Sequence, residues 1–297
     1  MSGLLRGYLF VIASAFIYGC MPLMTKLIYA DGVNSLSVVL LRNALALPFL
    51  ALLAYRQSGS FCIPKTALPS IAAIAFMGCC VTPYLLFSSY RYISSGTATV
   101  FHFVYPAVVL LGSILFLGKK CRRGDVLCVV LCVAGISLFY DPAQPIALPG
   151  SILAVTSGFT YAIYILLLSS FKHKSISGYK LNFYVSAISC VILLSVCLCT
   201  KQLTLPVTPR GWALSFLLSL TISAGAVFLF QQGTFLIGGE RAGILSTVEP
   251  ITSVFVGALV FREPLGLRTL TGSFLVILAS FLIAFFDLRR SKKSMCT

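Results

Sequence analysis

The stretch TATVFHFVYP, residues 97–106, has a counterpart in RAGILSTVEP, residues 241–250, at an offset of 144 residues. A second pair, ASAFIY at residues 13–18 and TSGFTY at residues 156–161, matches at an offset of 143. Each half of the chain carries both blocks in the same order. Two matched pairs at nearly equal offsets predict an internal repeat, with one structural unit in each half.

The composition around these blocks is that of a membrane protein. Of the 297 residues, 59% are hydrophobic and 10% are charged, and the mean hydropathy is +1.00. A soluble domain carries about 25% charged residues. The chain is therefore not a water-soluble enzyme, a disordered protein or a disulfide-stapled secreted scaffold. We expect an all-α polytopic membrane protein.

Hydropathy and turn residues predict ten transmembrane helices, each of the roughly 20 residues needed to cross a bilayer. Five helices fall in each repeat, and because five is odd, the second repeat enters the membrane with the opposite orientation. We expect the first repeat over residues 1–144, the second over 145–288 and a basic tail over 289–297. The predicted spans are residues 7–29, 35–55, 67–90, 97–117, 125–140, 150–171, 179–200, 211–237, 242–261 and 268–286.

The distribution of basic residues predicts the orientation of the chain. With the N-terminus inside, the inner segments hold fifteen Lys and Arg and the outer segments hold six. Cytoplasmic loops of membrane proteins carry the excess of Lys and Arg. The sequence therefore predicts a plasma (inner) membrane protein with both termini in the cytoplasm. The net charge of +15 then reflects contact with anionic lipid rather than with nucleic acid.

Cysteine usage gives no sign of a metal site or a disulfide framework. Most of the eleven cysteines lie in apolar runs, where free Cys acts as a small apolar filler. Cys128 and Cys132 are one helical turn apart, but no His or carboxylate accompanies them. A phosphate-binding loop and a zinc-protease motif are also missing from the sequence. We expect no metal, no cofactor and no enzymatic activity.

The segment from Gly239 to Pro250, which continues through Gly257 to Phe261-Arg262-Glu263-Pro264-Leu265, resembles the second EamA repeat of the drug/metabolite transporter superfamily. A weaker copy in the first half runs from Gly96-Thr97 through Tyr105-Pro106 to Leu117-Gly118. The first repeat departs from the family pattern, because Lys119 follows Gly118 where a glutamate is usual.

The resemblance implies a carrier with a central cavity between two inverted five-helix halves. It also implies alternating access and export of an amino acid or related amphipathic metabolite. Efflux of cationic drugs is an open alternative, and so are uptake, a homodimer and proton coupling. A membrane-embedded lipid-modifying enzyme and a non-transporting adaptor are more remote readings.

Glu249 is the strongest candidate for function. A carboxylate about eight residues into an apolar span is costly unless it is paired, hydrated or protonated, so such residues mark transport sites. In the alignment of the repeats Tyr105 matches Glu249, and His102 matches Ser246. His102 is either a packing residue or, with Glu249, part of a proton relay.

Two prolines at matching places predict bends in the fourth and ninth helices. Pro106 and Pro250 lack an N–H group, so the carbonyls of His102 and Ser246 lose their helical partners. Freed carbonyls inside a membrane are tolerated where other helices or a water-filled cavity satisfy them. We therefore expect the bends to lie at the substrate site, with the helices moving about them.

Other polar and aromatic residues within the spans complete the predicted site. Arg42 is expected to snorkel to the outer surface, with pairing to Glu249 or binding of a substrate carboxylate as alternatives. Three tyrosines are candidates for an aromatic wall around the substrate, and two neighbouring amides are candidates for hydrogen bonds across helices. These residues are Tyr18, Tyr161, Tyr164, Gln231 and Gln232.

Overall fold

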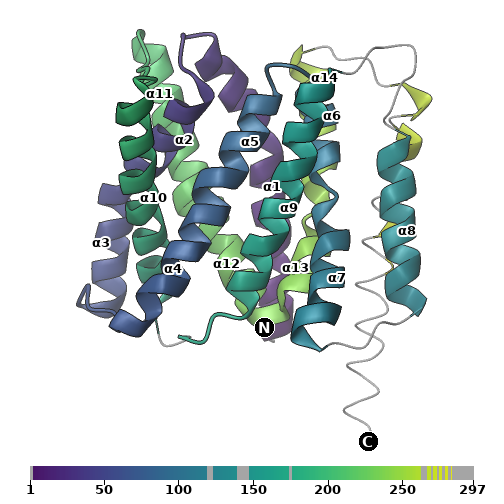
Figure 1. Cartoon of the computed structure of the whole chain (residues 1–297), viewed down its shortest axis with the longest axis horizontal. Helices are drawn as coiled ribbons and strands as arrows, with labels where there is room; N and C mark the ends of the chain where they lie inside the picture. Colours follow the sequence, from purple (N-terminus) through teal and green to yellow (C-terminus); the bar gives the residue numbers. More distant parts are fainter. Residues whose placement is uncertain are drawn as a thin grey trace, which may run out of the picture.

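The computed structural model describes residues 3–118, 123–138, 147–173, 176–261, 266–268, 270–272, 274, 275, 278, 279 and 282. Over these residues every regular element is a helix (Figure 1). The helices are α1 (Gly3–Tyr29), α2 (Ser35–Ala44), α3 (Leu47–Ser58), η1 (Lys65–Ala67), α4 (Leu68–Ile74), η2 (Ala75–Val81), α5 (Thr82–Ser89), α6 (Ser95–His102), α7 (Tyr105–Leu117), α8 (Arg123–Ser137), α9 (Leu148–Ser169), α10 (Gly178–Thr200), α11 (Pro209–Leu218), η3 (Ser219–Ala226), α12 (Val227–Ile237), α13 (Gly239–Leu245) and α14 (Val248–Phe261).

Eight stretches of the described chain are long and apolar enough to cross a membrane, and they correspond to eight of the ten predicted spans. The predicted fifth span is α8, whose apolar part, Val126–Gly135, is shorter. The predicted tenth span lies largely outside the described residues. Its Ala279 packs against Cys128 of α8, which is compatible with a tenth helix beside the fifth. The ten-helix count, the tail and the boundary between the repeats stay predictions.

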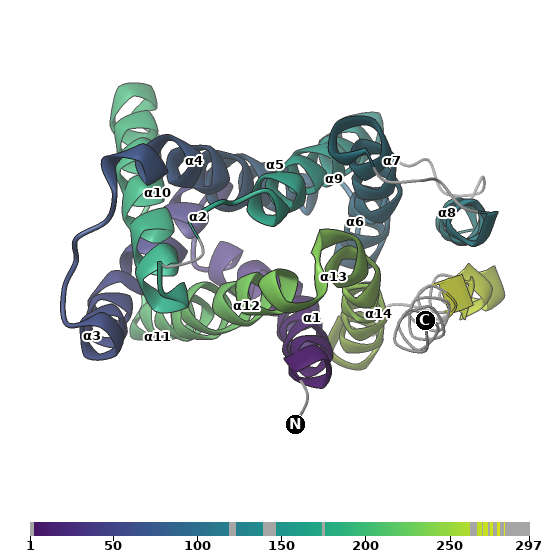
Figure 2. The same cartoon turned by 90° about the horizontal axis from the view of Figure 1, so that it is seen from below.

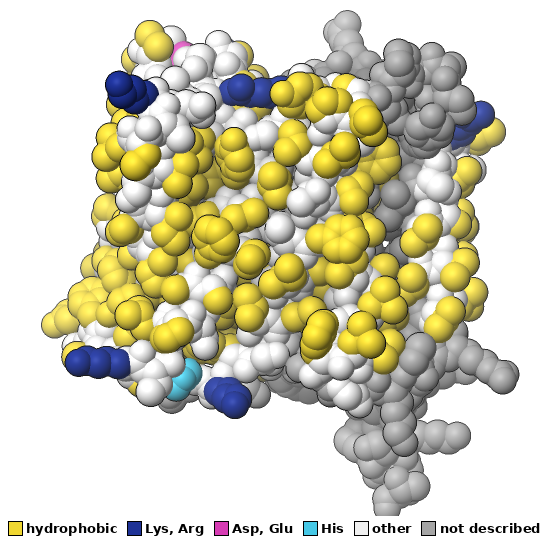
Figure 3. Space-filling model, viewed as in Figure 1, with side chains coloured by type: hydrophobic (Ala, Val, Ile, Leu, Met, Phe, Trp, Pro, Cys, Tyr) yellow, Lys and Arg dark blue, Asp and Glu magenta, His cyan; other side chains and the backbone are white. Residues whose placement is uncertain are grey.

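The surface of the molecule is adapted to lipid. Figure 3 shows apolar side chains over most of one face, with Lys and Arg side chains along its upper and lower edges. On α1 the large apolar residues Leu9 and Phe16 are exposed, whereas Ser14 and Thr25 are buried. Polar groups inside and apolar groups outside are what a bilayer requires, since unpaired polar groups are costly in hydrocarbon. The protein is an integral membrane protein.

The two halves pack against each other through equivalent helices (Figure 2). The first long helix, α1, packs against α12 and α14 of the second half. Its counterpart in the second half, α9, packs against α5, α6 and α7 of the first half. The fourth and ninth spans also contact each other through their opposite parts: α6 contacts α14, and α7 contacts α13. The interface of the halves is thus built from the repeated blocks.

The fourth and ninth spans are both interrupted near their prolines. The fourth breaks at Phe103 and Val104, between α6 and α7, and the ninth breaks at Ser246 and Thr247, between α13 and α14. Pro106 occupies the first turn of α7, where its missing N–H leaves no bond unmade. Two breaks at equivalent places divide each span into two short helices.

A second pair of irregularities was not predicted. The third span contains the π-helical segment η2, and the eighth contains the π-helical segment η3, which begins 144 residues later. A π-helical turn leaves carbonyl groups without their usual partners, and such turns are found at functional sites. The segment η2 packs against α9 and α10 of the second half, and η3 packs against α1 and α2 of the first half.

A buried asparagine holds a carbonyl of each π-helical segment. Asn43 Nδ2 donates to the Cys79 carbonyl at 3.4 Å, and Asn182 Nδ2 donates to the Ser223 carbonyl at 2.7 Å. Cys79 and Ser223 occupy equivalent positions in the two repeats. The Oδ1 atom of each asparagine is buried without a hydrogen-bond partner. The two repeats therefore share the same hydrogen bond from an asparagine to a π-helical carbonyl, which we call the asparagine latch. In each latch the amide nitrogen is hydrogen-bonded and the amide oxygen is not.

Loops from the two halves are joined beyond the end of α1. The Asp31 carboxylate accepts hydrogen bonds from the backbone N–H groups of Val207 and Thr208, at 2.8 and 3.1 Å. The Thr208 side chain also bonds to this carboxylate, and together these bonds hold the pKa of Asp31 below its usual value. Nearby, the backbone N–H of Asn34 donates to Thr204 Oγ1 at 2.8 Å.

Candidate functional site

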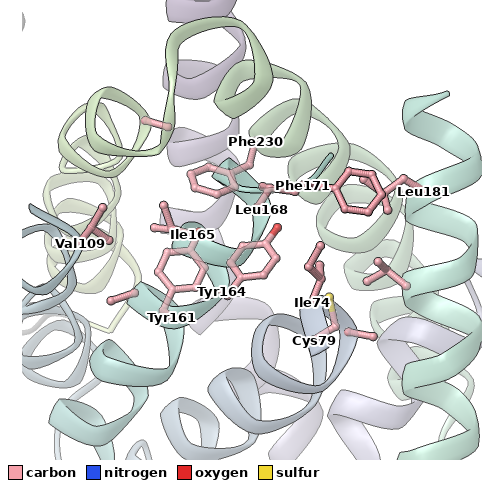
Figure 4. Close-up of a cluster of buried hydrophobic side chains, with 14 of the residues drawn as sticks. Ile74, Cys79, Val109, Tyr161, Tyr164, Ile165, Leu168, Phe171, Leu181 and Phe230 are labelled. Atoms are coloured by element: carbon pink, nitrogen blue, oxygen red, sulfur yellow. The ribbon is translucent and has the colours of Figure 1, made fainter. Parts of the chain in front are cut away.

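An aromatic cluster from both halves occupies the centre of the protein. Tyr161 and Tyr164 lie side by side on α9, stacked with ring centroids 5.4 Å apart, and Phe230 of α12 faces both of them (Figure 4). Tyr105 of α7 meets Tyr161 edge-on at 4.7 Å. His102 lies 5.2 Å from the same ring. Four of these five were predicted site residues, and the structure brings those four into contact.

Glu249 lies directly after the break in the ninth span and is 4% exposed. Its backbone N–H donates to the Ser246 carbonyl at 2.9 Å, which closes the turn between α13 and α14. Among the described residues, no side chain forms an ion pair or hydrogen bond with the Glu249 carboxylate. Tyr18, Tyr90 and Tyr161 lie within its electrostatic range. Within the described part of the chain, the site thus contains a buried acid without a counter-charge.

His102 is anchored to the opposite half. Its Nδ1 lies 2.7 Å from the Ser157 hydroxyl, which in turn donates to the Ala154 carbonyl at 2.6 Å. Because a hydroxyl has a single proton, this geometry makes His102 Nδ1–H the donor and leaves Nε2 as an acceptor. No hydrogen bond or ion pair among the described residues joins His102 to Glu249, and the Tyr161 ring contacts the first and is near the second.

The expectation that Arg42 snorkels to the outer surface is wrong. Its side chain is 3% exposed, and it lies in the last turn of α2, where the second span is interrupted at Leu45 and Ala46. The Arg42 carbonyl accepts a hydrogen bond from Ser219 Oγ at 2.8 Å, at the start of η3. The guanidinium therefore lies inside the protein, which the sequence of this apolar span did not indicate.

The remaining predicted residues divide between the cluster and its surroundings. Gln231 is fully buried near the Tyr164 hydroxyl, although neither atom of its amide makes a hydrogen bond of normal geometry. Gln232 reaches Gly178 at the start of α10 and does not join the cluster. The Ser246 hydroxyl donates to the Ala242 carbonyl of the preceding helix, α13, at 2.8 Å.

Two glycines allow the long helices to pass close to the breaks. A Cβ added at Gly158 of α9 would collide with the carbonyl oxygen of His102, the last residue of α6. A Cβ added at Gly19 of α1 would lie 2.8 Å from the carbonyl oxygen of Glu249. Each break is therefore in backbone contact with the long helix of the opposite half.

We expect Gly158→Ala to destabilise the protein by about 1–3 kcal/mol, because the added methyl meets rigid backbone. The control is Gly243→Ala in α13, where a Cβ would meet the nearest atom at 3.6 Å. That substitution should be neutral or stabilising, since alanine favours a helix over glycine by about 1 kcal/mol. Thermal unfolding of both purified variants checks this, and equal melting temperatures would contradict the close contact.

Comparison with known proteins agrees with this architecture. The EamA-like transporter family matches the chain twice, over residues 5–140 and over residues 148–285. One solved protein structure superposes with a TM-score of 0.73 at 14% sequence identity, covering 95% of this chain and 98% of the other. That similarity concerns the fold.

Curated relatives are transporters. An uncharacterized transporter of Archaeoglobus fulgidus is 27% identical over 278 residues, which is 92% of this chain and 94% of the relative. The pseudopaline exporter of Pseudomonas aeruginosa is 25% identical over 284 residues, again 92% and 94%. The uncharacterized transporter YwfM of Bacillus subtilis is 26% identical over 237 residues, or 78% and 79%. The chain is therefore a membrane transporter that belongs to the EamA-like transporter family, within the drug/metabolite transporter superfamily.

Proposed function

We propose that this transporter is a secondary carrier that exports a small amphipathic metabolite, an amino acid or a related compound, by alternating access. Glu249 is the group that carries the coupling proton. The aromatic cluster and the polar side chains beside it form the substrate site. The carrier works in the plasma membrane with both termini in the cytoplasm.

The observation that carries the proposal is the buried Glu249 carboxylate, which has no side-chain partner among the residues that the structure describes. An unpaired charge at this depth is strongly unfavourable, so the acid is driven to bind a proton or a cationic group. A carboxylate that exchanges these two partners couples the movement of one to the movement of the other. Tyr18 and Tyr161, both within its electrostatic range, supply hydroxyl groups nearby.

The interrupted helices support alternating access. In each half the long helix, α1 or α9, runs against a broken span and a π-helical segment of the other half. Breaks and π-helical turns are the places where a helix changes direction with the smallest loss of hydrogen bonds. The asparagine latches at Asn43 and Asn182 hold equivalent carbonyls, so each can release as its span bends. Ten helices in two inverted repeats, over residues 1–144 and 145–288, complete this proposal.

Export is favoured by the relative that carries pseudopaline out of the cell, since this chain aligns with 94% of that protein. Efflux of a cationic drug is the second candidate, because tyrosine rings beside an unpaired carboxylate suit an organic cation. A lipid-modifying enzyme would release a covalently changed product. A homodimer stays a prediction.

The test uses inside-out membrane vesicles, in which an exporter accumulates its substrate in the lumen. Vesicles with and without the protein are given a deproteinised cell extract and an acidic lumen, and the contents are identified by mass spectrometry. We expect unchanged metabolites to accumulate only with the protein, and accumulation to stop when the pH gradient is collapsed. Covalently altered products, or no accumulation that depends on the protein, would overturn the proposed carrier.

A further inference from the structure

Arg42 is a buried cation that none of the described residues neutralises. Its guanidinium group has five N–H donors, yet Nη1 contacts only the Met21 sulfur, at 3.9 Å, and Nε has no hydrogen-bond partner. The Cys79 thiol is a further polar neighbour of the guanidinium. Sulfur is a weak acceptor. Among the described residues, no carboxylate lies within ion-pair distance of Arg42.

The position of this cation is fixed from two sides. The Arg42 carbonyl is held by Ser219 of the opposite half, and the neighbouring Asn43 donates to the Cys79 carbonyl. Side chains that bind a ligand work best when the backbone beneath them is locked by such bonds. The guanidinium is therefore presented at a defined place, although nothing in the described protein pairs with it.

Arg42 and Glu249 are both near the same tyrosine. Tyr18 of α1 is within electrostatic range of both, and Tyr164 is within range of Arg42. Tyr18 is half-buried in spite of this central position. The site thus has a positive group on α2 and a negative group on α14, each near Tyr18. No direct pairing of the two groups is observed.

We infer that Arg42 binds the carboxylate of the substrate, and that the substrate is an amino-carboxylate: a compact apolar molecule with a carboxylate at one end and an amine at the other. This deepens the proposed function and rests on it. Guanidinium groups recognise carboxylates through two parallel hydrogen bonds. The amine faces Glu249, which takes up a proton when the amine leaves. A substrate with positive charge alone is repelled by Arg42.

The experiment compares wild type with Arg42→Gln, Arg42→Lys and Arg56→Gln in the same inside-out vesicles and cell extract. Arg56 is an exposed arginine of the same span and serves as the matched control. We expect the wild-type cargo to be compounds with a carboxylate and an amine, and their methyl esters to be refused. Uptake should fall about 10- to 100-fold in Arg42→Gln, the loss of a charge-assisted pair. It should fall less in Arg42→Lys and stay unchanged in Arg56→Gln.

Thermal unfolding of the ligand-free variants separates binding from a structural role. Removing an unneutralised buried charge should leave the melting temperature unchanged or raise it, whereas removing a structural cation would lower it. Wild-type cargo without a carboxylate, equal uptake of the methyl esters, full uptake by Arg42→Gln, or an unstable Arg42→Gln protein would each overturn the inference. Absence of any uptake that depends on the wild-type protein would instead overturn the carrier proposal, and this inference with it.

Discussion

Glu249→Gln is expected to reduce proton-driven transport by about 100-fold or more, the scale on which a required proton-transfer group acts. Glutamine has nearly the same shape, so packing at the break between α13 and α14 is preserved. Its side chain does not ionise, so it cannot release a proton to bind a substrate amine. Flux into proteoliposomes along an imposed pH gradient measures the effect.

The protein should remain folded in this variant, because the substitution removes a buried charge that no described residue neutralises. Asp31→Asn is the control, since Asp31 is a half-buried carboxylate in the loop after α1, and asparagine keeps an acceptor oxygen for Val207 and Thr208. Flux at neutral pH should fall far less in this variant than in Glu249→Gln. Substrate exchange without a gradient should survive in Glu249→Gln better than gradient-driven uptake. Normal gradient-driven flux in Glu249→Gln would show that the coupling proton is carried elsewhere.

A reversible cross-link between the halves should stop transport altogether. Thr99 of α6 and Ser253 of α14 are buried, and their hydroxyl oxygens are 3.3 Å apart. Cysteines at both positions are close enough to form a disulfide across the two halves. If the halves must separate here in each cycle, oxidation should abolish uptake and a reducing agent should restore it. The background is a protein whose eleven native cysteines have been replaced.

The control for the cross-link is a disulfide that stays within one half. Ser94 and Thr97 flank the start of α6, and their hydroxyls are 2.8 Å apart. Cysteines at these two positions should cross-link without changing uptake. Full transport by the oxidised Thr99→Cys and Ser253→Cys protein would mean that the halves do not part along α6 and α14.

The repeat and the class of protein could be predicted from the sequence because they depend on pattern. The apolar runs of membrane length form membrane-length helices in the structure. The matched blocks, at offsets of 143 and 144, lie in helices that pack against the opposite half. Glu249, His102 and Tyr161 could be selected as candidates from the sequence because they are polar or aromatic residues within matched blocks; their roles stay predictions. Helix breaks lie close to Pro106 and Pro250 because the loss of an N–H group is a local property of proline.

Features that depend on packing between helices were missed. The π-helical segments η2 and η3 carry no proline at equivalent places, and their apolar sequences look like ordinary spans. Asn43 and Asn182 were a usable signal, since an amide within an apolar span needs a partner. Their offset of 139 differs from that of the repeat, which hides the equivalence. The depth of Arg42 depends on a break in the second span that hydropathy does not reveal.

The most direct test of the central claim is the accessibility of a cysteine at position 246, in the break beside Glu249, within the cysteine-free background. A membrane-impermeant thiol reagent is applied to inside-out and to right-side-out vesicles, with and without a transported compound. If the site opens to each side of the membrane in turn, the cysteine should react from both sides, and the compound should shift the balance between them. Reaction from one side alone, or from neither, under all these conditions would contradict an alternating-access carrier.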